Sequence, residues 1–192
     1  MEFLEQIDRQ IFLYLNAFHS PFWDVLMYWI SYKFTWIPLY FSVLVYFVYK
    51  QKTRGILSIV FTILSIALAD QISVHFFKNV FLRYRPCHNL EIQNLVHILH
   101  QHCGGQYGFV SSHASNAFVF SVFSALIIQK RNLSIALILW ATIVSYSRIY
   151  LGVHYPADLL AGAALGTSIA FVVYWAYKFV SKKYFKEKLV NI

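Results

Sequence analysis

Long apolar stretches separated by short polar breaks make up most of this sequence. A membrane-spanning helix needs about 20 mainly apolar residues. The stretches therefore predict five spans, at about residues 34–50, 55–82, 112–129, 132–148 and 157–180. Five spans with short loops use up most of the chain, so we expect a single all-α membrane domain over residues 1–192.

The sequence does not decide whether the first 32 residues form a sixth span. Residues 2–18 are amphipathic, and Pro21 separates them from the apolar, aromatic stretch 22–32, which is too short to span. Residues 1–32 either lie in the membrane interface with their apolar face down or form two pieces of a broken span. The expected fold is thus a helical bundle of five to six spans.

Composition and charge support a membrane location. Of the residues, 59% are hydrophobic and 12% are charged, whereas charged residues make up roughly 25% of a soluble domain. The net charge of +8 does not indicate a nucleic-acid partner, because the basic residues alternate with apolar spans instead of forming one stripe. No obligatory protein partner is evident, and membrane lipids are the expected surroundings.

Ten basic residues share one side of the predicted membrane: Lys50, Lys52, Arg54, Lys130, Arg131, Lys178, Lys182, Lys183, Lys186 and Lys188. Because lysine and arginine mark the inner side, the opposite helix ends and the 86–110 loop are expected to face outward. We expect a bacterial inner (cytoplasmic) membrane, with the site on its periplasmic or outer face.

Two segments at the outward side carry candidate phosphate ligands. Lys78 and Arg85 are seven residues apart, so within one helix they would share a face, about 10 Å apart along the axis. Pro86 predicts a helix end there. Ser111 or Ser112 is expected to cap the span that begins near residue 112, whose N-terminus suits a phosphate.

The third segment is more specific. Pro156 fits the first position of the last span, which places His154 just outside this helix and Asp158 in its first turn. A histidine that attacks phosphorus presents one neutral ring nitrogen while the other donates to an acceptor that fixes the tautomer. His154 and Asp158 fit that pairing, and His113, in the first turn of its span, would protonate the leaving oxygen.

These segments resemble the three signature motifs of the type 2 phosphatidic acid phosphatase family. The first is matched by Lys78, Arg85 and Pro86, and the third by Ser147, Arg148, His154 and Asp158. The second is usually proline-serine-glycine-histidine, and here it is Val110, Ser111, Ser112 and His113. Two of its four positions depart, which puts phosphate binding by the backbone N–H of Ser112 in doubt.

The resemblance implies a six-helix lipid phosphatase that needs no metal and no other cofactor. It implies that His154 is the nucleophile, Asp158 its partner and His113 the general acid. The phosphate ligands that it implies are Lys78, Arg85, Ser111, Ser112 and Arg148.

The substrate and the exact reaction are less determined. Undecaprenyl diphosphate or a phospholipid monophosphate is the expected lipid phosphate substrate, and lipid A phosphates stay open. A lipid phosphotransferase using the same phosphohistidine is the nearest rival. A membrane transporter is disfavoured, because it would spread polar residues through the spans rather than gather them at one face.

The 86–110 loop contains Cys87 and Cys103, which in an oxidising compartment could pair as a disulfide. With the nearby histidines they could instead form a metal cluster, although the spacing fits no standard zinc pattern. Free thiols are the third alternative. These histidines are His88, His97, His100 and His102.

Overall fold

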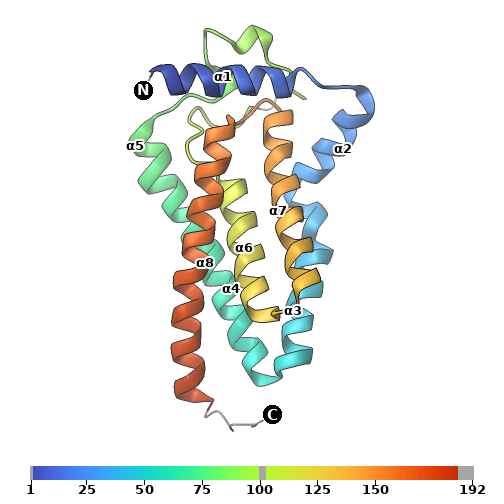
Figure 1. Ribbon diagram of the computed structural model, residues 1–192, viewed down its shortest axis with the longest axis vertical. Coiled ribbons are helices and arrows are strands. Elements are labelled where there is room, and N and C mark those ends of the chain that lie inside the picture. The colour runs from blue at the N-terminus through green and yellow to red at the C-terminus, as the bar shows by residue number, and fades with distance from the viewer. Residues whose placement is uncertain (1, 100–102, 186–192) are drawn as a thin grey trace.

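The protein is a bundle of helices, shown in Figure 1 as a computed structural model that describes residues 2–99 and 103–185. The helices are α1 (Glu2–Asn16), α2 (Pro21–Ser31), α3 (Ile37–Gln51), α4 (Thr53–Ile72), α5 (Asn79–Phe81), α6 (Ser112–Ile128), α7 (Arg131–Tyr150) and α8 (Pro156–Tyr184). Short helical turns complete it: η1 (Lys33–Trp36), η2 (Ser73–Lys78), η3 (Pro86–His88) and η4 (Gln93–Leu95). The expected all-α membrane fold is confirmed.

Three helical stretches are long and apolar enough to cross a membrane: Thr53–Phe81, Arg131–Tyr150 and Pro156–Tyr184. The apolar helix α6 is shorter, with 17 residues, and α3 has 15. Among the described residues, length and composition thus identify three spans, and the total of five to six stays a prediction.

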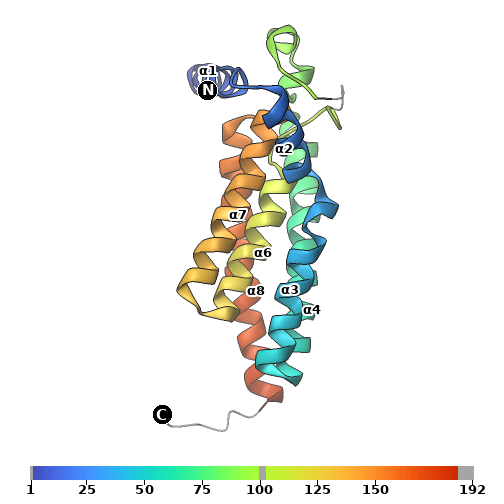
Figure 2. The same cartoon turned by 90° about the vertical axis from the view of Figure 1, so that its right-hand side faces the viewer.

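The helix α1 lies across one end of the bundle, at a steep angle to the other long helices (Figures 1 and 2). We call this end the α1 end. The helix α2 turns away from α1 and continues through η1 into α3. Residues 2–18 and 22–32 therefore do not line up as two pieces of one span, and α1 has the orientation expected of an interfacial helix.

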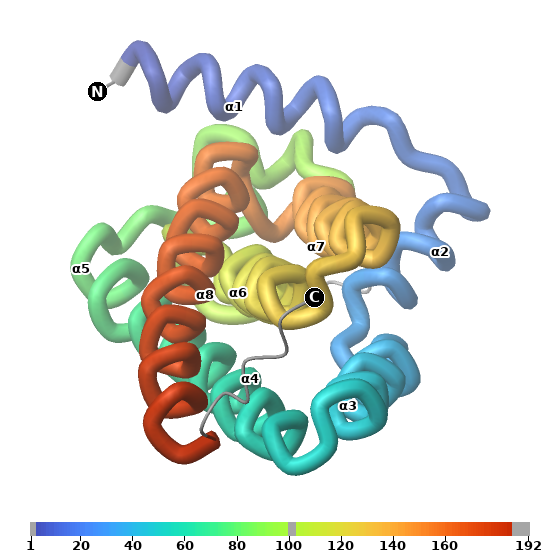
Figure 3. Tube along the Cα trace, turned by 60° about the horizontal axis from the view of Figure 1, so that its bottom comes forward, coloured from blue at the N-terminus to red at the C-terminus, as the bar shows by residue number. Residues whose placement is uncertain are grey.

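The most tightly packed pair of helices is α6 and α8. Figure 3 shows α6 in the middle of the bundle, surrounded by α3, α4, α7 and α8. A Cβ atom on Gly162 would lie 2.6 Å from the carbonyl oxygen of Ser111, and one on Gly166 would collide with that of Ser115. Small residues allow helix backbones to approach closely in membranes. The glycines thus bring the beginnings of α6 and α8 together at the α1 end.

The segment from Lys78 to Arg85 is helical only in its first part. The helical run that begins with α4 ends at Phe81, because Leu82 adopts the left-handed conformation with φ 47°. The next residues are extended, and Tyr84 pairs with Tyr107 in an isolated β-bridge. Lys78 and Arg85 therefore do not share one helix, which was the condition for a shared face. The helix end expected at Pro86 was wrong, because Pro86 lies beyond an extended segment.

The basic helix ends lie opposite the α1 end. They include the end of α3 with Lys50, the start of α4 with Arg54 and the last turn of α8 with Lys182. Lys186 and Lys188, which belong to the same predicted cluster, lie outside the described residues. The charge separation along the bundle is thus as expected, and the orientation in a membrane stays a prediction.

Candidate active site

The buried pair of His154 and Asp158 lies at the α1 end, where the chain enters α8. The helix begins at Pro156, as expected, and the backbone N–H of Tyr155 donates to Asp158 Oδ2 at 3.1 Å, which closes a capping box. The distance between His154 Nδ1 and Asp158 Oδ2 is 3.2 Å. His154 is 1% and Asp158 0% exposed. The capping geometry holds the carboxylate against the imidazole.

The other nitrogen of His154 faces a guanidinium. Arg85 Nη1 donates to His154 Nε2 at 3.1 Å and to the carbonyl oxygen of Val153 at 3.2 Å. Because Arg85 can only donate, Nε2 accepts, and the ring proton is on Nδ1, where it donates to Asp158. Burial lowers the pKa of His154 well below its ordinary value of 6.5, and the charges of Arg85 and Arg148 lower it further. The imidazole is therefore neutral, with its lone pair on Nε2.

The start of α6 is joined to the end of the α4 run by side chains. Ser111 is the N-cap, with its Oγ accepting from the N–H of Ala114 at 3.4 Å. Lys78 Nζ donates to Ser112 Oγ at 2.7 Å, and Ser73 Oγ lies 2.6 Å from the same atom. The serine that replaces the usual glycine thus supplies a hydroxyl that holds the lysine of the first motif.

The remaining cation, Arg148, lies near the end of α7, where its Nη1 donates to Ser31 Oγ. Its Nε and that of Arg85 are buried without a hydrogen-bond partner among the described residues. Buried donors are normally satisfied, so two guanidinium N–H groups remain for an anion. Ser147, the neighbour of Arg148 in the motif, instead donates to the carbonyl oxygen of Val144 within its own helix.

His113 lines two cavities of about 570 Å³ each. Both cavities also include Ser31 and Lys33, and Arg148 belongs to the first. The second runs between α3, α4, α6 and α7. Asp70 and Asn116 line it beside Ser112 and His113, and the rest of its wall is mainly apolar, with side chains that include Tyr40, Leu44, Ile63, Ile66 and Phe120. Polar chemistry at one end and an apolar wall behind it suit a ligand with an anionic head and a lipid body.

The structure thus gathers all eight predicted catalytic and phosphate-binding residues at the α1 end. Three further residues at this site were missed. Arg83 Nη1 donates to Asp158 Oδ1 at 2.8 Å and Arg83 Nη2 to Asp8 Oδ2 at 2.7 Å. A Cβ on Gly108 would lie 3.1 Å from Asp158 Oδ2 and 3.4 Å from His154 Nδ1, so this loop backbone closes over the pair. Of these three residues, Arg83 is the one that the sequence could have indicated, because it lies two residues before Arg85 of the first motif.

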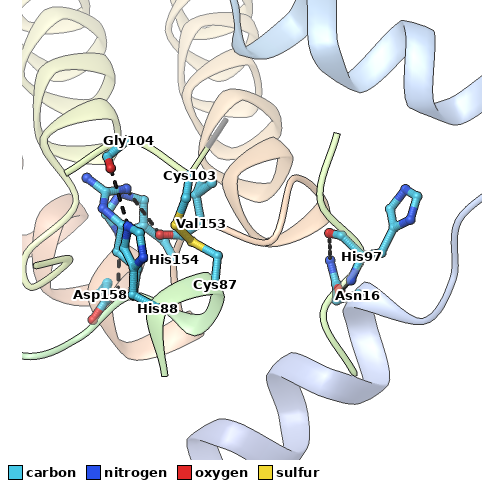
Figure 4. The surroundings of a disulfide bond; sticks show 10 residues. Asn16, Cys87, His88, His97, Cys103, Gly104, Val153, His154 and Asp158 are labelled. Atoms are coloured by element: carbon cyan, nitrogen blue, oxygen red, sulfur yellow. Dashed lines mark hydrogen bonds and ion pairs between the residues drawn. A yellow bond between two sulfur atoms is a disulfide. The ribbon is translucent and has the colours of Figure 1, made fainter. Parts of the chain in front are cut away.

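Cys87 and Cys103 are joined in a disulfide with a Cα–Cα distance of 6.0 Å. Figure 4 shows it beside Val153, which packs against Cys87, and near His154. His88 is close to both sulfurs, but sulfurs bonded to each other are not thiolate ligands.

Of the other loop histidines, the structure describes His97, which does not lie at that disulfide. His97 lies 2.9 Å from Asp24, away from it in Figure 4. His100 and His102 lie outside the described residues. The described part of the loop therefore offers a cross-link rather than a metal cluster.

The PAP2 superfamily, which is the family that the three motifs resemble, matches residues 55–182. The chain belongs to the PAP2 superfamily. The matched residues contain all three motifs, whereas Asp8 lies before them.

Named PAP2 relatives agree with this membership. A lipid A 4'-phosphatase of Bacteroides thetaiotaomicron is 40% identical over 95% of this chain and 80% of its own length. An undecaprenyl-diphosphatase of Sulfolobus acidocaldarius is 30% identical over 73% of this chain and 62% of its own length. The crystal structure of a PAP2-type phosphatidylglycerolphosphate phosphatase from Bacillus subtilis superposes with a TM-score of 0.72 at 22% identity, covering 98% and 90% of the two chains. That last likeness concerns the fold alone.

The neutral, buried state of His154 predicts how stability depends on pH. The pKa of His154 is lower in the folded than in the unfolded protein, so below about pH 6.5 the unfolded state binds a proton that the folded state excludes. The free energy of unfolding should therefore fall as the pH falls below this value. His154→Gln removes the effect, so the melting temperature of the wild type should fall relative to that of the variant from about pH 7.5 to about pH 5.

Thermal unfolding of both purified proteins in one detergent measures this difference. A difference that stays constant over the pH range, or that changes in favour of the wild type at low pH, would show that His154 is not held neutral by its surroundings.

Proposed function

We propose that this protein removes a phosphate group from a phosphorylated lipid, with lipid A as the first candidate, through a phosphohistidine at His154. One observation carries the mechanism: His154 donates from Nδ1 to Asp158 and holds its lone pair on Nε2 among cations. As a PAP2 member with relatives named as phosphatases, the chain is a phosphoric ester hydrolase of the membrane.

The first chemical step forms a bond between His154 Nε2 and phosphorus and breaks the bond between phosphorus and the lipid oxygen. Arg85 donates to Nε2 at 3.1 Å, so a phosphate that arrives there exchanges this contact for contacts between the guanidinium and its own oxygens. The imidazole gains positive charge as the bond forms. Asp158, hydrogen-bonded to Nδ1, stabilises that charge and keeps the tautomer.

Charge on the transferred phosphoryl group is neutralised by protein cations. Phosphoryl transfer needs mainly positioning and electrostatic stabilisation of the equatorial oxygens. Lys78, Arg85 and Arg148 converge on this end of the bundle, and none of them has a carboxylate partner within 4 Å among the described residues. The N-terminus of α6 adds free N–H groups and the positive end of a helix dipole. These groups supply the stabilisation that a metal ion provides in other phosphatases.

We assign the proton transfers to His113. It lines both cavities, the first of them together with Arg148, where the oxygen that leaves with the lipid would be placed. In the first step His113 gives its proton to that oxygen. In the second it takes a proton from the water that attacks phosphorus, which releases inorganic phosphate and restores His154.

The substrate class is inferred from the relatives and from the apolar cavity. The lipid A 4'-phosphatase is more similar to this chain and covers more of it than the undecaprenyl-diphosphatase does. This changes the order expected from sequence, where undecaprenyl diphosphate and phospholipid monophosphates came first. Undecaprenyl diphosphate remains the second candidate, because a named relative acts on it.

We infer that the site faces outward from a bacterial inner membrane. The support is the charge separation along the bundle, with the basic helix ends opposite the α1 end. The disulfide at the α1 end agrees with an oxidising compartment. The single-domain organisation over residues 1–192 is part of the same proposal.

A panel of substrates tests the lipid assignment. Purified protein should release phosphate from lipid A with a kcat/KM at least about ten-fold above that for undecaprenyl diphosphate or a phosphatidylglycerophosphate, since about 1.4 kcal/mol of extra transition-state binding gives this factor. Chelator is present throughout, and His154→Ala is the blank. A higher kcat/KM for undecaprenyl diphosphate than for lipid A would overturn lipid A as the first candidate. No release of phosphate from any lipid phosphate would refute the proposed function.

The two histidines should respond differently to the leaving group. His154→Ala should abolish turnover for all substrates. His113→Ala should slow the first step, in which the leaving group departs, by about 100-fold or more for an alkyl phosphate and much less for an aryl phosphate whose phenol leaves without a proton. The ratio of variant to wild-type rate of leaving-group release in a single turnover is measured for both substrates, with melting temperatures as folding controls. If the good leaving group rescues His154→Ala and not His113→Ala, the two roles are reversed.

A further inference from the structure

We propose that Asp8 of the N-terminal helix is a positioning residue for catalysis, acting through Arg83 on the carboxylate that orients His154. The role rests on the proposed function of His154. Asp8 lies outside the residues matched by the family, on a helix that the motifs do not include. The contacts below connect it to the reacting histidine.

Arg83 bridges two carboxylates from opposite ends of the chain. Its Nη1 donates to Asp158 Oδ1 at 2.8 Å, and its Nη2 donates to Asp8 Oδ2 at 2.7 Å. The side chains of Asp8, Arg83 and Asp158 are 11%, 19% and 0% exposed. Ion pairs with so little access to solvent are weakly screened, so a change of charge at Asp8 alters the electrostatic potential at Asp158.

Asp8 also touches the helix that carries Asp158. Its second oxygen, Oδ1, accepts from the backbone N–H of Ala157 at 2.9 Å, in the first turn of α8. The guanidinium of Arg83 lies over the ring of Tyr155, 4.3 Å from the ring centroid. The arginine is thus held by one face of an aromatic ring and by two carboxylates, and its position relative to Asp158 is fixed.

The orientation of Asp158 depends on this arrangement. Its Oδ2 accepts hydrogen bonds from the backbone N–H of Tyr155 and from Nδ1 of His154. Among the described residues, its Oδ1 accepts a side-chain hydrogen bond from Arg83 alone. Without Arg83 the carboxylate would be free to rotate about the bond that now directs Oδ2 at the imidazole. Arg83 therefore fixes the orientation of the Asp158 carboxylate, on which the tautomer of His154 depends.

Charge gives Asp8 its own role. Asp158 stabilises the positive charge that His154 gains when it bonds phosphorus, but Arg83 offsets part of the negative charge of Asp158. Asp8 offsets Arg83 in turn, so charges of alternating sign run from α1 to the imidazole. Loss of the Asp8 charge leaves Arg83 to pair with Asp158 alone and weakens the stabilisation of His154 in the transition state.

A purely structural role for Asp8 would be to anchor α1, and the chain offers a matched control for that role. Asn16 is also on α1 and 1% exposed. Its Nδ2 donates to the carbonyl oxygens of His97, Ile149 and Tyr150, and its Oδ1 accepts from the N–H of His97 (Figure 4). Asn16 makes no hydrogen bond to Arg83 or Asp158, both of which the structure describes, so Asn16→Ala loosens α1 without altering the alternating charges of Asp8, Arg83 and Asp158.

The test compares kcat, KM and melting temperature of full-length variants, with an aryl phosphate as the probe. Asp8→Asn should lower kcat about ten-fold and leave KM within about two-fold, because the lost interaction acts in the transition state. Asp8→Glu should recover part of kcat. Asn16→Ala should lower the melting temperature with kcat near the wild-type value, and Glu5→Gln, an exposed acid on the same helix, should change neither.

A double-mutant cycle then shows whether the effect passes through Arg83. In the background of Arg83→Gln, itself impaired, Asp8→Asn should cause no further loss of kcat. Three results would each overturn the positioning role: wild-type kcat in Asp8→Asn, an equal loss of kcat in Asn16→Ala, or an undiminished loss from Asp8→Asn in the Arg83→Gln background. An inactive wild type would overturn the proposed function and this role together, whereas an active wild type matched by Asp8→Asn overturns this role alone.

Discussion

The close contact between α6 and α8 is the constraint on which the rest of the structure depends. Gly162 and Gly166 remove the side chains that would strike the backbone of α6 at Ser111 and Ser115. In a bilayer, helices gain little from hydrophobic burial against each other, so close packing of small residues is a main source of association. The same contact allows the N–H of Ser111 to donate to the carbonyl oxygen of Asp158 at 3.0 Å. The segments of both histidines are thereby fixed to one another.

The site, held in place by the contact between α6 and α8, concentrates positive charge where solvent screens it poorly. His154 and Asp158 are almost fully buried, and two guanidinium N–H groups beside them have no partner among the described residues. Burial of unpaired charge costs free energy. A phosphate that binds there relieves that cost, which connects the unfavourable electrostatics of the site with its affinity for an anionic group. On the other side of the imidazole, at Nδ1, the charges alternate in sign from Asp158 through Arg83 to Asp8.

Local chemistry made much of the site predictable from sequence. Pro156 at the start of α8 and the serine cap of α6 set where His154, Asp158 and His113 lie, because these signals act within one helical turn. The helix end expected at Pro86 was wrong, since Leu82 leaves the helix and the β-bridge between Tyr84 and Tyr107 joins the next residues to the loop. Such a pairing spans more than twenty residues and has no local signal. Asp8 was missed for the same reason, because its partner Arg83 is 75 residues away.

The central claim is that His154 carries the phosphoryl group between the two steps. Its most direct test uses His113→Ala with a radiolabelled aryl phosphate, because the first step then needs no proton donor while the second lacks its base. After an alkaline quench, which preserves phosphohistidine, we expect label on the peptide that contains His154 and none in the double variant that also carries His154→Ala. Continued turnover with label on another residue, or with no labelled protein at any time, would contradict the account.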